Sequence, residues 1–162
     1  MGGDPEHEDR LSLLSELLPV ADTVLLCGIT GNLFLKAKGG NIGKSVYNAE
    51  LLGKAQELLD AASAQGVKVL LPIDAYTANE LSLKVKPSLE GASGMFADKM
   101  IGDIGPRTVK LFTNAIITAG TLFAEGSAGV YEIPAFAKGT EELKKAVGKS
   151  GADRIGRSFV IK

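Results

Sequence analysis

The succession of helix and strand that decides the fold lies at residues 48–72, which read NAELLGKAQELLDAASAQGVKVLLP. Asn48 is a typical N-cap residue, and Gly66 stands where glycine commonly ends a helix. Between them, apolar residues recur at the spacing of one helix face, at Leu51, Leu52, Ala55, Leu58, Leu59 and Ala62. Residues 67–72 (VKVLLP) then form a short apolar run, which predicts a strand buried on both faces. A helix followed by such a strand is typical of a parallel sheet.

The same alternation recurs outward from this stretch. Similar apolar runs predict strands at residues 23–27, 121–124 and 157–161. Helical spacing and Pro or Gly boundaries predict helices at residues 11–18, 32–36, 106–118 and 134–147. Residues 77–104 mix short strands, glycines and turns without a clear period. We therefore predict an α/β domain at residues 9–162, after a polar tail at residues 1–8. Its sheet is expected to be doubly wound and Rossmann-like, mainly parallel, with helices on both faces.

The composition is that of one ordinary globular domain. The chain has 162 residues, 45% hydrophobic and 23% charged, which argues against disorder. Eighteen basic residues nearly balance 19 acidic ones, so the chain lacks the positive excess that a nucleic-acid surface needs. No apolar run approaches the ~18 residues that span a bilayer, and the acidic start has no signal-peptide pattern.

The counts of cysteine and histidine restrict redox and metal chemistry. The single cysteine excludes an internal disulfide and suits a reducing compartment. One cysteine and one histidine also make a zinc site improbable. We expect a soluble intracellular protein, in the cytoplasm by preference, although an organelle or a flagellum is compatible with this composition.

In such a sheet a ligand lies beyond the carboxyl ends of the strands. Residues 27–32 (CGITGN) follow the first strand, and their glycines could approach a base or a phosphate, although a plain turn into a helix explains them equally well. Residues 125–132 (EGSAGVYE) follow a later strand, and the Glu132 carboxylate could accept hydrogen bonds from ribose hydroxyls. The alternative is that Glu132 is a solvated residue at a helix start. Cys27 is interpreted as a small core residue rather than a nucleophile.

Four separated segments together resemble the C-terminal, nucleotide-binding domain of phosphoglycerate kinase. They are FLKAKGGNIGKSV (residues 34–46), GVKVLLPIDAYTANEL (66–81), DIGPRTVKLF (103–112) and EGSAGVYEIPAFAKGTEELKKAV (125–147). Their order and spacing agree with that family over residues 9–148.

The resemblance implies roles for particular residues. Arg10 stands at the family's lysine that contacts the transferred phosphate, and no other catalytic residue is assigned. Gly28 belongs to the family's triple-glycine adenine platform, here CGITG, where Cys27 and Ile29 add side chains. Gly126, Gly129 and the ribose-binding position Glu132 complete the expected nucleotide site.

Several departures from the family pattern argue against catalysis by this chain alone. Glu125 would repel nucleotide phosphates by about 1 kcal/mol at 4 Å even in water. The family's GGGD turn, whose aspartate holds Mg²⁺, would follow the final strand, and its basic 3-phosphoglycerate site lies in an N-terminal domain. We therefore expect ADP or ATP binding to be weak or lost, with no magnesium or other metal site in these residues.

Two functions from different classes follow. The first is a domain that is non-catalytic alone and serves as a binding or structural module in a larger assembly, with other protein subunits covering an open sheet edge. The second is the nucleotide-binding part of an active phosphoglycerate kinase, transferring a phosphoryl group between ATP and 3-phosphoglycerate with the missing domain. Nucleotide sensing without catalysis is a third hypothesis. Neither nucleic acid nor membrane insertion is expected.

Overall fold

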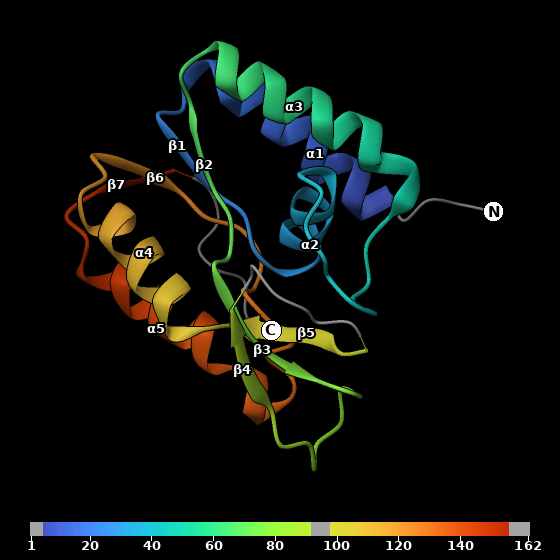
Figure 1. Ribbon diagram of the computed structural model, residues 1–162. Coiled ribbons are helices and arrows are strands. Elements are labelled where there is room, and N and C mark those ends of the chain that lie inside the picture. The colour runs from blue at the N-terminus through green and yellow to red at the C-terminus, as the bar shows by residue number, and fades with distance from the viewer. Residues whose placement is uncertain (1–4, 92–97, 156–162) are drawn as a thin grey trace.

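The computed structural model describes residues 5–91 and 98–155 (Figure 1). Its α-helices are α1 (Pro5–Leu17), α2 (Gly28–Ala37), α3 (Leu52–Ala64), α4 (Pro106–Ile117) and α5 (Lys138–Lys149). Short 3₁₀ turns are η1 (Leu18–Val20), η2 (Ala49–Leu51) and η3 (Pro134–Phe136). The strands are β1 (Thr23–Leu25), β2 (Lys68–Leu70), β3 (Asp74–Ala78), β4 (Ser88–Gly91), β5 (Met100–Ile104), β6 (Thr121–Phe123) and β7 (Asp153–Ile155).

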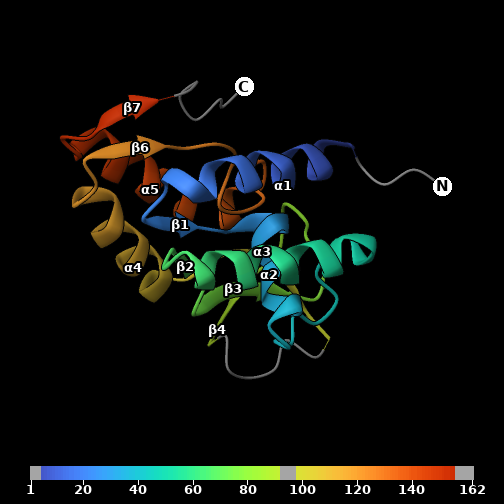
Figure 2. The same cartoon turned by 90° about the horizontal axis from the view of Figure 1, so that it is seen from above.

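Parallel strands form the centre of the molecule. β1 pairs with β2, and β6 pairs with β7, both in parallel. The four strands lie side by side in the order β7, β6, β1, β2 (Figure 2). The α/β class with parallel strands, predicted from the alternation of helices and apolar runs, is confirmed.

Successive side chains of these strands enter two different cores, as the two-residue period of a strand requires. Val24 and Val69 pack into a core under α1, α2 and α3, whereas Leu25 and Leu70 pack into a second core with α4 and α5. The helices therefore cover both faces of the parallel strands (Figure 1).

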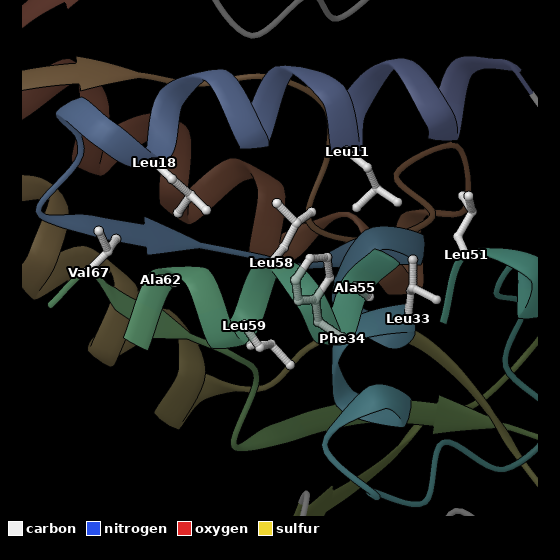
Figure 3. Close-up of a cluster of buried hydrophobic side chains, with 10 residues drawn as sticks. All are labelled: Leu11, Leu18, Leu33, Phe34, Leu51, Ala55, Leu58, Leu59, Ala62 and Val67. Atoms are coloured by element: carbon white, nitrogen blue, oxygen red, sulfur yellow. The ribbon is translucent and has the colours of Figure 1, made fainter. Parts of the chain in front are cut away.

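The first core is the larger of the two clusters. Figure 3 shows its buried members: Leu11, Leu18, Leu33, Phe34, Leu51, Ala55, Leu58, Leu59, Ala62 and Val67. They come from α1, α2, α3 and the turns beside them, so the leucines of the first predicted helix and the apolar face of residues 48–66 meet each other. This contact holds α1 over strands β1 and β2, whose Val24 and Val69 side chains pack into the same core.

A second sheet, antiparallel and three-stranded in the order β4-β3-β5, was not predicted from residues 77–104. Tyr76 lies opposite Asp103 and Thr77 lies opposite Ile101, so Gly102 is an extra residue in β5 and forms a bulge. A Cβ atom at Gly102 would overlap the Phe136 ring, so the bulge accommodates only a glycine. This sheet brings β5 against α2 and α5.

Local signals placed most helix boundaries correctly. The Asn48 side chain accepts a hydrogen bond from the Glu50 amide at 3.1 Å, and Gly66 has a positive φ of 73° after α3. α1 begins at Pro5, inside the stretch expected to be a polar tail. The helix predicted from the leucines at residues 11–18 therefore extends further toward the N-terminus. α2 begins at Gly28, earlier than the brief helix predicted at residues 32–36. The strand predicted at residues 157–161 lies outside the described residues.

Candidate functional site

The carboxyl end of β1 meets the loop that follows β6. Gly28, the first residue of α2, has a φ of 60°, and a Cβ atom there would lie 3.1 Å from the Ser127 carbonyl oxygen. The amino terminus of α2 and the loop at residues 125–131 are therefore in contact. Only a glycine combines this backbone conformation with so close an approach.

Arg10 joins this junction from α1. Gly126 also has a positive φ, 77°, and a Cβ atom on it would lie 4.0 Å from the Arg10 Nη2 atom. Arg10 is half-buried. The structure thus places Arg10 beside Gly126, and Gly28 beside Ser127, the next residue of the same loop. A guanidinium and a helix amino terminus both attract anions, whereas the exposed Glu125 carboxylate at the start of the same loop repels them.

Gly129 and Glu132 occupy different surroundings. A Cβ atom on Gly129 would lie 2.5 Å from the Gly102 carbonyl oxygen and 2.6 Å from Asp103 Oδ1, so Gly129 serves close packing against β5. Glu132 is exposed and stands immediately before Ile133, the N-cap of η3. Its position matches the solvated glutamate at a helix start, and its carboxylate remains accessible to a ribose.

The side chains added to the glycine platform restrict its space. Ile29 is 39% exposed at the start of α2. The small pocket beside it, lined by Leu11, Ile29, Thr30, Leu33 and Asn48, has a volume of about 10 Å³. This is room for about one water molecule.

Cys27 is half-buried before α2 and is a poor nucleophile. Burial, and secondarily the charge of Asp103, raises the pKa of the Cys27 thiol to about 12. The thiolate is the reactive form of cysteine, so the thiol is inert at neutral pH. Cys27 instead packs beside the second core, in agreement with its interpretation as a small core residue.

Two buried aspartates, missed in the sequence, hold helices beside the junction. Asp103 on β5 accepts hydrogen bonds from the Gly139 amide at 2.7 Å and from the Ile104 amide at 2.8 Å. Burial raises the pKa of Asp103 to about 6, although these two amides oppose the shift and Glu141 adds to it. Asp103 thereby anchors the first turn of α5.

Asp74 does the same for α4. Its carboxylate accepts hydrogen bonds from the Arg107 and Thr108 amides, at 2.9 and 2.7 Å, and from the Thr108 hydroxyl at 2.7 Å. The signal that could have identified both aspartates is an acidic residue inside an apolar run, in LLPIDA and in IGDIGP. Such residues are rarely buried without partners.

Among residues 5–91 and 98–155, no three His, Cys, Asp or Glu side chains cluster closely enough to hold a metal ion. None of the helices described is both long and apolar enough to cross a membrane.

Comparison with known proteins identifies the relatives of this fold. A sequence model of the family described as phosphoglycerate kinase matches residues 1–158. This chain belongs to the phosphoglycerate kinase family. The resemblance of the four segments is therefore confirmed. Phosphoglycerate kinase of Koribacter versatilis is 38% identical over 155 residues, which are 94% of this chain and 38% of that protein. That of Acidobacterium capsulatum is 37% identical over 160 residues, 98% of this chain and 39% of that protein.

Solved phosphoglycerate kinases have the same fold. The structure from Coxiella burnetii matches with a TM-score of 0.88 and 36% identity, covering 91% of this chain and 38% of that one. The structure from Pyrococcus horikoshii OT3 matches with a TM-score of 0.68 and 29% identity, over 93% of this chain and 38% of the other. This chain thus spans less than two fifths of the length of these phosphoglycerate kinases.

Proposed function

We propose that this domain binds an adenine nucleotide weakly, mainly through its phosphates, and does not transfer a phosphoryl group by itself. The observation that supports this is the meeting of Arg10, Gly28 and Gly126 where α1, α2 and the loop at residues 125–131 come together. Family membership supports the choice of ligand, because relatives that share this segment are named phosphoglycerate kinases.

Each part of the junction suits one part of the ligand. The Arg10 guanidinium can form charge-assisted hydrogen bonds to phosphate oxygens, and the first amides of α2 favour the same negative charge. Glu132 is exposed and can accept hydrogen bonds from ribose hydroxyls. The residues therefore fit the sugar and the phosphates better than the base, because the partly exposed Ile29 side chain adds bulk at the start of α2.

Weak affinity and lack of turnover have a physical basis in the same residues. Glu125 is exposed at the start of the loop and repels phosphates. Phosphoryl transfer depends on positioning and on electrostatic stabilisation of the transferred group. A nucleotide that is held loosely beside a carboxylate is poorly positioned, and its transferred phosphoryl group is poorly stabilised.

Calorimetric titration with MgADP and MgATP tests the proposal. We expect saturable binding at millimolar nucleotide, about tenfold weaker in Arg10→Gln, since a charge-assisted bond contributes on the order of 1.5 kcal/mol. Glu125→Gln should bind about fivefold more tightly, because about 1 kcal/mol of repulsion is removed. Lys110→Gln, an exposed cation on α4, is the matched control and should leave binding unchanged. No binding by the wild type at millimolar nucleotide would contradict the proposal.

The alternative is that this chain is the nucleotide-binding part of an active phosphoglycerate kinase. It is supported by 38% identity to a protein of that name over 94% of this chain. The test is to mix the chain with the N-terminal half of a phosphoglycerate kinase and to assay phosphoryl transfer from ATP to 3-phosphoglycerate. Transfer that requires both parts would establish the alternative in place of a non-catalytic domain.

A role as a structural or binding module in an assembly is favoured by exposed apolar side chains. Val20, Val46 and Leu83 are 81%, 63% and 77% exposed, and β7 ends the row of parallel strands among the described residues. Unpaired strand edges recruit partners. Protein subunits covering this edge remain our proposal for a partner. Sedimentation velocity that finds only monomer at high concentration, together with a search for stable partners that finds none, would count against it.

We propose the cytoplasm as the compartment of this domain. Its single cysteine suits a reducing environment. Fluorescence microscopy of the tagged protein checks this, and labelling of an organelle or a flagellum would contradict it.

A further inference from the structure

The bulge in β5 directs one backbone carbonyl at the loop of residues 125–131. Gly102 is the extra residue, and its carbonyl oxygen accepts a hydrogen bond from the Val130 amide at 2.8 Å. Gly129, one residue earlier in the loop, lies against both Gly102 and Asp103. Bulges commonly redirect groups near functional sites. β5 therefore supports the loop from beneath at residues 129 and 130.

The Asp103 carboxylate extends this support to α5. Its Oδ2 atom accepts from the Gly139 amide and its Oδ1 atom accepts from the Ile104 amide, so both oxygens are engaged. Asp103 is 0% exposed. A buried carboxylate with directed hydrogen bonds holds its partners in a narrow range of positions. The first turn of α5 is thus held at a defined distance from β5.

Thr140 connects this anchored turn back to the loop. It follows Gly139 directly, is 2% exposed, and its hydroxyl accepts a hydrogen bond from the Ala128 amide at 2.9 Å. The Ser127 hydroxyl donates to the Gly129 carbonyl oxygen at 2.9 Å, which stabilises the turn between these contacts. Residues 128–130 are therefore held by α5 on one side and by β5 on the other.

The other end of the loop faces the ligand junction. The Ser127 carbonyl oxygen abuts Gly28 at the start of α2, and Gly126 abuts Arg10. Any displacement of residues 128–130 would alter the gap between this loop and α2. We infer that Asp103 and Thr140 are positioning residues that hold the 125–131 loop against the amino terminus of α2 and so set nucleotide affinity without contacting the nucleotide. The part of this inference that concerns affinity rests on the proposed function.

Charged and titratable groups around Asp103 are consistent with a positioning role. Glu141 on α5 and Cys27 before α2 both interact with its charge. Neither is a cation, so the amides of Gly139 and Ile104 provide its stabilising contacts in the described structure. Asp103 therefore acts through its directed hydrogen bonds to these amides rather than through an ion pair.

Thr140 variants test the inference most directly. Thr140→Val keeps the shape and removes the hydroxyl acceptor, whereas Thr140→Ser keeps the hydroxyl. We expect hydrogen exchange of the Ala128 amide, followed by NMR, to be about tenfold faster in Thr140→Val, because one buried hydrogen bond is lost. Calorimetry should show MgADP binding weakened by a similar factor. Thr140→Ser should restore both values to near wild type.

Asp103→Asn and Asp74→Asn form a matched pair. Each removes a buried carboxylate that caps a helix. Among the described hydrogen bonds, α5 reaches the loop through Thr140, whereas α4 shares only the apolar core with Ala128. We expect faster exchange at Ala128 and Val130 and weaker MgADP binding only in Asp103→Asn. Equal behaviour of the two aspartate variants, or of Thr140→Val and Thr140→Ser, would overturn the inference.

The two proposals fail differently. If the wild type binds no nucleotide, the proposed function and the affinity part fail, while hydrogen exchange still decides whether Asp103 and Thr140 hold the loop. If Asp103→Asn does not fold, the two Thr140 variants decide the outcome.

Discussion

Glycines crowd around the buried Asp103 and Phe136, and their missing side chains allow α5 and η3 to approach β5 closely. A Cβ atom on Gly139 would overlap Asp103 Oδ1, and one on Gly102 would overlap the Phe136 ring. The neighbours in these contacts are buried and held in place, so they cannot move aside at low cost. Sequence alone gives no reason to distinguish these glycines from the others.

Gly139→Ala should therefore lower the free energy of unfolding by about 1–3 kcal/mol, the usual cost of overpacking. Gly148, in the same helix, has no atom within 4 Å of a Cβ position, so Gly148→Ala is the matched control. It should raise stability by up to about 1 kcal/mol, the helix propensity difference between alanine and glycine. Urea denaturation measures both. Similar effects of the two variants would show that the packing around Gly139 is not as close as described.

Cys27 should react with a thiol reagent only when the protein unfolds. The pKa of the thiol is raised to about 12, mainly by burial, so native protein at pH 8 contains little thiolate. Alkylation rates in buffer and in urea measure the difference. Asp103→Asn removes the secondary cause but not the burial, so native alkylation should stay slow in that variant. A native rate equal to that in urea would contradict the assignment of Cys27 to the core.

At the scale of elements, the N-terminus of the η2–α3 segment depends on one local side chain. Asn48→Ala removes the acceptor for the Glu50 amide and should cost about 0.5–2 kcal/mol of stability. Asn48→Asp keeps an acceptor and should stay near wild type. Thermal or urea denaturation measures the loss. An alanine variant as stable as the aspartate variant would mean that the cap contributes nothing here.

Elements with signals within their own residues could be predicted from sequence. α3 has its cap and its terminal glycine nearby, and Pro106 stands in the first turn of α4. The antiparallel β4-β3-β5 sheet could not be predicted, because β5 contains a glycine bulge that disrupts the period of two. Its pairings join residues distant in sequence, which no local pattern reveals.

The positions of some candidate site residues could be predicted from the family resemblance, although their roles stay predictions. Arg10, Gly28 and Gly126 came from resemblance to the family, and the structure brings them together. Gly129 lies in the expected loop and packs closely against β5, and its part in nucleotide binding stays a prediction. The support from Asp103 and Thr140 remained hidden, because it depends on a carboxylate and a hydroxyl that meet their partners only in the folded chain.

For the whole molecule, Asp103 should make stability depend on pH. Its pKa rises from the ordinary 3.8 to about 6 on folding, so the folded state binds more protons between these values. The contribution is fully present below about pH 4 and is lost as the pH rises through 6, by on the order of 2–3 kcal/mol.

Urea unfolding at several pH values between 4 and 7 measures this dependence. The wild type should lose more stability over this interval than Asp103→Asn, which cannot ionise at that position. Asp74→Asn retains Asp103 and should follow the wild-type slope. Parallel curves for wild type and Asp103→Asn would contradict the raised pKa.

The two aspartate caps also bear on the order in which the chain can assemble. Asp74 caps a helix 33 residues further along, and Asp103 caps one 36 residues further along. Each aspartate therefore leaves the ribosome before the helix that its carboxylate caps. α4 and α5 lack a side-chain N-cap of their own, so they gain one only from strands made earlier. The molecule is thus suited to folding in the direction of its synthesis, with each later helix completed by an earlier strand.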